Sequence, residues 1–205
     1  MRTEVKNFDR QQIFDIYNSR ENPFIMLTTK VNVTNVYDYC KVNKRFYATM
    51  IYLITSVANE MDCFKYRCEK GKIYKYDKLR ANMVEKYNDD EIGFMSFYEN
   101  NLKSFRNTFI EKQKEFREKH IVFEPIDEGE IWFSCVPEFT FSQLVTPFDR
   151  NITIPQFTWD KVQEENGNYY VDLAMLIHHG FADGSHIAQF LEKLNNKISN
   201  FDELI

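Results

Sequence analysis

The order of helix and strand patterns along this chain predicts an α/β protein. A helical pattern over Asp9–Ser19 precedes a β-rich run, IMLTTKVNVT, and a long apolar helix pattern covers Tyr47–Met61. Nearer the C terminus, an alternating strand pattern over Tyr169–His179 leads directly into an amphipathic helix. Because the chain has 205 residues and no low-complexity tract or flexible linker, we expect one domain over residues 1–205.

Three helices are expected before residue 130. The first, Asp9–Ser19, has apolar residues at helical spacing and is closed by the dipeptide Asn22-Pro23. The second, Tyr47–Met61, is mostly apolar, and its large residues recur at i, i+3, i+4 and i+7, so we expect it to face the core. A third helix is expected over Ser104–His120.

Strand patterns dominate the second half of the chain. Glu130–Phe141 is rich in aromatic and β-branched residues, and Pro137 predicts that this strand ends or bulges near its middle. Asn151–Trp159 is expected to be a second, shorter strand. In Tyr169–His179 the odd positions are large and apolar, and His179 continues that face.

Composition excludes several classes of function. A net charge of -5 argues against extended binding of nucleic acid, which usually requires a basic face. The chain shows no signal pattern, and its longest apolar stretch, near residues 48–58, is about half a membrane span, so a cytoplasmic protein is expected. The four cysteines form no CxxC pair and are expected to be buried or partly buried thiols.

The segment most informative about chemistry is HHGFADGSH, which begins at His178. Here a strand ends in a turn that carries an imidazole. An acid and a glycine follow, and then a helix that starts near Asp183 or Ser185. Acyl transfer to an alcohol needs a base near the hydroxyl, and histidine is a side chain that can take a proton and return it, so His179 is the candidate general base. Since His178 points to the other side of the strand, the histidines make a poor zinc site. Alternatively, His179 is a hydrogen-bonded core residue and Asp183 only caps the helix.

The pattern HHxxxDGxH at a strand-to-helix junction resembles the active-site motif of the chloramphenicol acetyltransferases, and the resemblance extends over nearly the whole chain. It implies a two-layer α/β sandwich with a mixed β-sheet flanked by helices, the fold of CoA-dependent acyltransferases. It also implies that His179 is the general base.

Four further stretches carry the resemblance. Phe8-Asp9-Arg10 with Phe14 is similar to the N-terminal motif of the family, which implies an ion pair between Arg10 and Asp183. Arg45-Phe46-Tyr47 is similar to the entry into the family's long helix, and Arg45 would then meet a coenzyme A phosphate.

Ser134-Cys135-Val136-Pro137 resembles the family's Ser-x-x-Pro, in which the serine hydroxyl binds the oxyanion, so Ser134 is the oxyanion candidate. Thr158-Trp159-Asp160-Lys161 resembles the Thr-x-x-Lys segment. The resemblance implies that Thr158 holds a water in the active site and that Lys161 lies near coenzyme A.

The chain departs from the family pattern at positions that affect the acceptor pocket. Glu138 and Val162 stand where the family has Trp and often Tyr, and Trp132 replaces a residue that is commonly smaller. Gln11-Gln12 replaces a frequent Lys-Glu. An acidic pocket residue such as Glu138 would favour a cationic acceptor.

The resemblance implies an acetyl-CoA-dependent O-acetyltransferase, without a metal, that acts on chloramphenicol or a related acceptor, as enzymes of antibiotic resistance do. It also implies a homotrimer with active sites between subunits. Two alternatives stay open: an acyltransferase for another hydroxyl or amino acceptor, and a non-catalytic ligand-binding protein. The presence together of Arg10, Ser134, Thr158, His179 and Asp183 argues against the last.

Overall fold

The computed structural model describes residues 1–88, 90–122 and 128–205. In this part of the chain the main sheet has seven strands, of which six follow the order β2-β10-β8-β7-β5-β6 and β9 pairs with β10. Strand β7 runs parallel to both of its neighbours, and the remaining pairs are antiparallel, so the sheet is mixed. The strands are β2 (Phe24–Asn32), β5 (Arg80–Lys86), β6 (Ile92–Phe97), β7 (Glu130–Cys135), β8 (Gln156–Trp159), β9 (Gln163–Glu165) and β10 (Asn168–His178).

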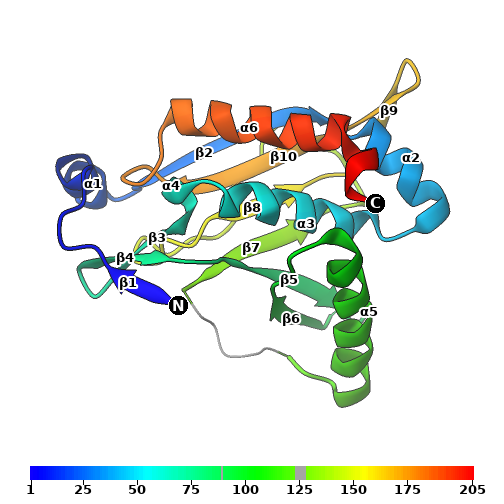
Figure 1. The fold of residues 1–205 in the computed structure, drawn as a ribbon, viewed down its shortest axis with the longest axis horizontal. Coiled ribbons are helices and arrows are strands. Elements are labelled where there is room, and N and C mark those ends of the chain that lie inside the picture. Colours follow the sequence, from blue (N-terminus) through cyan, green and yellow to red (C-terminus); the bar gives the residue numbers. More distant parts are fainter. Residues whose placement is uncertain (89, 123–127) are drawn as a thin grey trace.

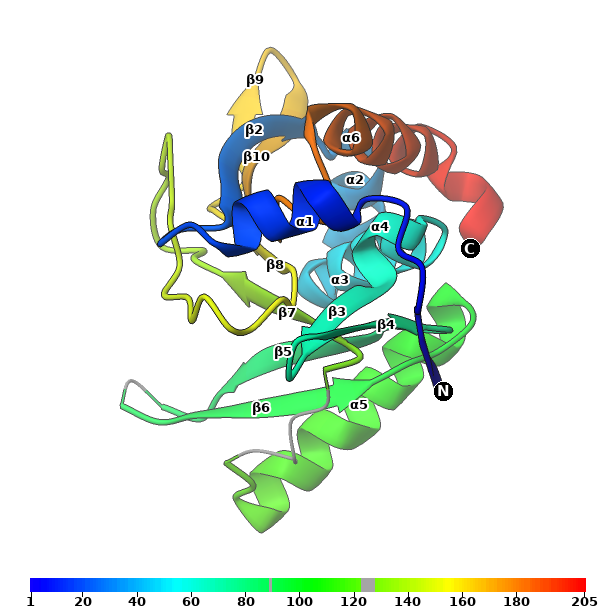
Figure 2. The same cartoon turned by 90° about the vertical axis from the view of Figure 1, so that its left-hand side faces the viewer.

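Helices form a second layer on one face of this sheet (Figures 1 and 2). They are α2 (Thr34–Asn43), α3 (Phe46–Asn59), α5 (Leu102–Lys119) and α6 (Gly184–Ser199). The apolar helix α3 lies between α5 and α6 and reaches β5 and β7. This arrangement confirms the expected two-layer α/β fold with a mixed sheet.

Smaller elements lie around the end of the main sheet. Helix α1 (Gln11–Asn18) crosses that end, near the start of α6 (Figure 2). A three-stranded sheet in the order β1-β4-β3 continues from the short helix α4. These elements are β1 (Arg2–Glu4), α4 (Asp62–Lys65), β3 (Tyr66–Glu69) and β4 (Lys72–Tyr76), and a 3₁₀ turn covers Phe201–Leu204.

Alternation along the three central strands assigns their side chains to two faces. Odd-numbered residues enter the core beneath the helices: Ala81, Met83, Ile131, Phe133, Phe157 and Trp159 are all at most 3% exposed. Even-numbered residues therefore project from the opposite face of β5, β7 and β8. This second face carries Asn82, Trp132, Ser134, Gln156 and Thr158.

Several strands are shorter than their sequence patterns. The strand expected over Glu130–Phe141 ends at Cys135, two residues before Pro137. Of Asn151–Trp159, only Gln156–Trp159 is a strand, and it begins directly after Pro155. The run IMLTTKVNVT leaves the sheet after Asn32, whose side-chain oxygen accepts hydrogen bonds from the backbone and hydroxyl of Thr34 at 3.0 and 2.7 Å, and Thr34 begins α2.

The long strand β10 is buried on both faces in its C-terminal half. Leu173, Met175 and Ile177 are at most 3% exposed, and so is His178 on the other face. His179 lies just beyond the strand, in the turn before α6. No helix in the described part of the chain is long and apolar enough to cross a membrane. All four cysteines are free thiols and buried or partly buried, as expected.

Candidate active site

The junction between β10 and α6 brings together residues from the two ends of the chain. Asp183 is the N-cap of α6, and its Oδ1 accepts hydrogen bonds from the backbone N–H groups of Ser185 at 3.0 Å and His186 at 3.4 Å. Its Oδ2 accepts a hydrogen bond from Arg10 Nη1 at 3.0 Å, which is the ion pair that the family resemblance implies. Arg10 therefore ties α1 to the turn that carries His179.

Asp183 is an anion under all ordinary conditions. Hydrogen bonds from Ser185, His186 and Arg10 lower the pKa of its carboxyl group well below the usual range, against a smaller opposing effect of burial. One carboxylate thus both caps α6 and anchors Arg10.

His179 is half-buried, and two contacts fix its ring. Its Nδ1 lies 3.0 Å from the backbone oxygen of Ala182. Because a carbonyl oxygen only accepts hydrogen bonds, the neutral ring carries its proton on Nδ1 and leaves Nε2 with a free lone pair. Tyr17 stacks on the imidazole, with ring centroids 3.7 Å apart and an interplanar angle of 12°. The result is an imidazole held in one orientation by its neighbours.

His178 occupies a different environment although it is the next residue. Its ring is 2% exposed and lies among the rings of Phe14, Phe24 and Phe181. Its Nδ1 accepts a hydrogen bond from the backbone N–H of Gly180 at 3.2 Å. Burial, with a smaller contribution from His179, lowers the pKa of His178 to about 4, so this ring is neutral near pH 7.

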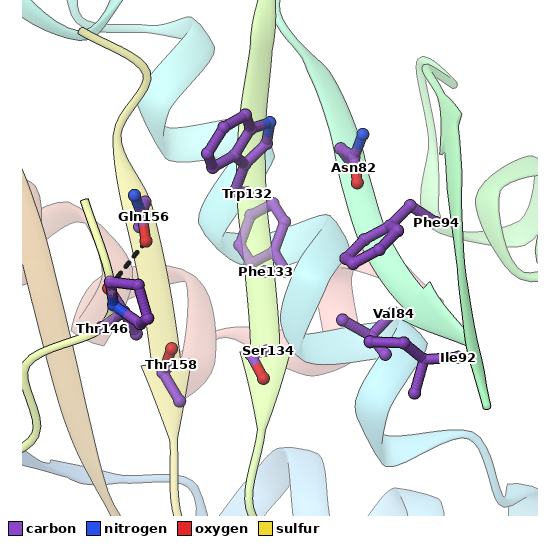
Figure 3. A pocket seen from close by; sticks show the side chains of 11 residues that line it. Asn82, Val84, Ile92, Phe94, Trp132, Phe133, Ser134, Thr146, Gln156 and Thr158 are labelled. Atoms are coloured by element: carbon purple, nitrogen blue, oxygen red, sulfur yellow. Dashed lines mark hydrogen bonds between the residues drawn. The ribbon is translucent and has the colours of Figure 1, made fainter. Parts of the chain in front are cut away.

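The free face of β5, β7 and β8 bears a cavity of about 620 Å³. Its polar groups are Asn82, Ser134, Thr146, Gln156 and Thr158, and the rest of its lining is apolar: Val84, Ile92, Phe94, Trp132, Phe133 and Pro147 (Figure 3). Ser134 and Thr158 are directly paired in the register of β7 and β8, so their side chains lie next to each other. Among the described residues, neither hydroxyl has a hydrogen-bond partner, which leaves both available to a ligand.

The cavity and His179 are separate parts of this chain. Thr158 pairs with Ala174, and His179 follows Ala174 by five residues, one residue past the end of β10, which corresponds to about 16 Å at 3.3 Å per residue. His179 is not among the residues that line the cavity. Arg10, His179 and Asp183 thus form one group, and Ser134 and Thr158 form another.

The remaining predicted residues lie outside both groups. Arg45 is exposed, adopts a left-handed conformation (φ 67°) before α3 and donates a hydrogen bond to Gln113 Oε1 at 3.2 Å. Lys161 is exposed just after β8. Glu138 is exposed beyond β7 and does not line the cavity. Its negative charge therefore gives no reason to expect a cationic acceptor in this pocket. Trp132 does line it.

Sequence reasoning missed three features of these sites. The helical spacing of Asp9–Ser19 identifies Tyr17 only as an apolar helix residue, and nothing in this spacing signals the stack on His179. Asn82 and Gln156 belong to no motif, and only the strand register places them across the cavity from each other. No metal-binding cluster of His, Cys, Asp or Glu occurs among the described residues.

Comparison with known proteins agrees with this architecture. A solved structure described as chloramphenicol acetyltransferase superposes with a TM-score of 0.82 at 22% identity, over 97% of this chain and 100% of the other. A probable dihydrolipoamide acetyltransferase from Listeria monocytogenes has a TM-score of 0.72 at 14% identity, over 97% of this chain and 94% of the other. At these identities the two structures establish the fold.

Sequence comparison establishes the family. A chloramphenicol acetyltransferase from Staphylococcus aureus is 26% identical over 210 aligned positions, which cover 98% of this chain and 97% of the relative. One from Clostridium perfringens is 24% identical, over 97% and 94% of the two chains. The family profile described as chloramphenicol acetyltransferase matches residues 1–195. The chain therefore belongs to the chloramphenicol acetyltransferase family and is an enzyme of acyl transfer.

Proposed function

We propose that this enzyme is an acetyl-CoA-dependent O-acetyltransferase in which His179 is the general base. The observation that carries the proposal is the hydrogen bond between His179 Nδ1 and the Ala182 oxygen, because it directs the free lone pair of Nε2 away from the turn. The stacked Tyr17 and the Arg10–Asp183 ion pair restrict the ring and the turn around it.

The reaction balances without a metal or a covalent acyl-enzyme. Nε2 of neutral His179 takes the proton of the acceptor hydroxyl, and the acceptor oxygen forms a bond to the thioester carbonyl carbon. Ser134 donates a hydrogen bond to the resulting oxyanion. The carbon–sulfur bond then breaks, and the CoA sulfur leaves with the proton from the imidazolium. Thr158, paired with Ser134, holds an active-site water in this proposal.

Two half-sites on one chain favour an active site between subunits. The distance of about 16 Å along β10 is too long for His179 to take a proton from an acceptor bound at Thr158 and Ser134 of the same chain. A second copy that presents its His179 to this cavity would complete the site. We therefore propose a homotrimer in which each active site combines two subunits.

The co-substrate needs cations for its phosphates. Arg45 and Lys161 are the proposed coenzyme A contacts, since both are exposed. Arg45 also stands at the N-terminus of α3, where backbone N–H groups favour an anion.

The acceptor is tested by incubating the purified enzyme with acetyl-CoA and chloramphenicol, other alcohols or amines. Release of CoA thiol is followed in solution, and the product is identified by its mass. If acetylated chloramphenicol forms, chloramphenicol is supported as the acceptor. If a different acetylated alcohol or amine forms instead, that compound is identified as the acceptor. If none of these acceptors raises thiol release above spontaneous hydrolysis, the proposal of acetyl transfer to an alcohol or amine is overturned.

A further inference from the structure

Resting on the proposed function, we infer that the acceptor is an uncharged, largely apolar alcohol with a second hydrogen-bond donor about 8 Å from its reacting hydroxyl, recognised by Asn82. We take this distance from the backbone separation of Asn82 and Ser134, the residues proposed to contact the two ends of the acceptor. Asn82 pairs with Trp132 on the next strand, at ~4.8 Å between strands, and Ser134 is two residues further along that strand, at ~3.3 Å per residue.

Asn82 is held by a fully buried carboxylate. Glu130 is 0% exposed, and its Oε2 accepts a hydrogen bond from Asn82 Nδ2 at 2.8 Å. The indole N–H of Trp132 also donates to this oxygen, at 3.3 Å. Arg80 Nη2 lies 3.5 Å from Oε1 and balances the charge. Glu130 thus fixes two residues of the cavity wall without lining the cavity.

These contacts determine which end of the Asn82 amide faces the cavity. An indole N–H only donates, so Glu130 Oε2 is an acceptor, and a flipped Asn82 would place two acceptor oxygens against each other. Figure 3 shows the nitrogens of Asn82 and Trp132 at the same end of the view, and the Asn82 oxygen turned toward Phe94. The wall therefore offers an acceptor, and it selects a ligand N–H or O–H.

A second polar group stands at the other end of the same cross-strand row. Asn82 pairs with Trp132, and Trp132 pairs with Gln156. Gln156 Oε1 accepts a hydrogen bond from the Thr146 hydroxyl at 2.6 Å, which leaves its amide N–H groups as donors. Since no charged side chain lines the described cavity, a charged ligand would be desolvated there without a partner.

The test compares two acceptors of almost identical shape: the N-methylamide of para-(hydroxymethyl)benzoic acid and its methyl ester. Only the amide can donate to Asn82. Affinity is measured by calorimetry, and kcat/KM by CoA thiol release. We expect the wild-type protein to prefer the amide about tenfold. The amide gains one net hydrogen bond, whereas the ester leaves the Asn82 oxygen unpaired.

Asn82→Leu is expected to bring the amide-to-ester ratio close to one. Gln156→Leu is the matched control in the same row, and it is expected to weaken both acceptors and preserve their ratio, because both carry the carbonyl oxygen. Both acceptors are measured on the same preparation, so the ratio does not depend on how much of a variant is folded. Glu130→Leu tests the positioning of Asn82, and its ratio is also expected to fall toward one.

Equal affinities of the wild-type protein for amide and ester, or no affinity for either, would overturn the inference. An unchanged ratio in Asn82→Leu would overturn the assignment to Asn82, and an unchanged ratio in Glu130→Leu would overturn the role of Glu130. Selective binding without any thiol release would contradict the proposed acetyl transfer and leave the recognition by Asn82 supported.

Discussion

Two neighbouring histidines acquire opposite properties from their surroundings. His178 is enclosed by three phenylalanine rings and kept neutral, whereas His179 is turned into a half-buried position and oriented through its Nδ1. The alternation of β10 accounts for the separation of the two rings. His178 therefore contributes to the packing of the junction, and His179 is available for chemistry.

The buried His178 is expected to make stability depend on pH. The unfolded chain binds this proton near the ordinary pKa of 6.5, but the folded protein binds it only near 4. The contribution of His178 to stability is therefore largest above pH 6.5 and falls as the pH drops toward 4, by about 3 kcal/mol in total. Urea unfolding at pH 7, 6 and 5 measures this loss. His178→Gln, which retains an acceptor for the Gly180 N–H, is expected to lose less stability over the same range, and an equal loss would contradict the account.

At the scale of elements, the contact of α1 with the β10–α6 turn positions the candidate base. A Cβ atom added at Gly180 would lie 2.8 Å from the Phe14 Cα and 2.7 Å from its ring, so α1 would have to shift. We expect Gly180→Ala to cost about 1–3 kcal/mol in unfolding free energy and to lower kcat. Gly184→Ala is the control, because nothing lies within 4 Å of its added Cβ, and its stability is expected to match the wild type. Equal stability of both variants would contradict this contact.

The N-cap and the ion pair of Asp183 are separable. Asn is as good an N-cap as Asp, so Asp183→Asn is expected to keep α6 capped while it removes the charge that holds Arg10. Asp183→Ala removes both and is expected to be less stable than Asp183→Asn by about 1 kcal/mol. Chemical denaturation and kcat are measured for both. If Asp183→Asn has wild-type kcat, the ion pair does not position His179.

Helices and strands were predictable where their patterns are long. The helices α3, α5 and α6 follow from helical periodicity, and the strand β10 follows from the large apolar residues at its odd positions. The ends of β2, β7 and β8 were not predictable from these patterns. A proline or an Asx turn stops the strand pairing there, although the composition of the run still favours a strand. The helix α2 was missed because its first residues read as the end of a strand.

At the scale of the whole molecule, the site residues come from distant parts of the sequence. Arg10 and Asp183 are 173 residues apart, and only the family resemblance suggested their contact. The pairing of Ser134 with Thr158, and the row from Asn82 to Gln156, depend on strand order and register, which periodicity does not specify. The sequence therefore predicts individual site residues more readily than it predicts how these residues are arranged in space.

The proposed trimer is expected to have a solution mass of about 74 kDa, from chains of 24.7 kDa. It also predicts complementation between inactive chains. When His179→Ala and Ser134→Ala chains are unfolded together and refolded as mixed trimers, about a quarter of the sites combine an intact His179 with an intact Ser134. Recovered thiol release at this level supports a site between subunits. No recovery from trimers shown to be mixed would place His179 and Ser134 in one chain.

The most direct test of the central claim compares His179→Ala with the wild type in acetyl-CoA turnover, on the best acceptor of the panel. His120→Ala, at an exposed position after α5, is the control for loss of an imidazole. A general base contributes about 10²- to 10⁴-fold, so kcat of His179→Ala is expected to fall by that factor, with His120→Ala unchanged. Equal kcat values for His179→Ala and the wild type would contradict the proposal that His179 takes the proton of the acceptor.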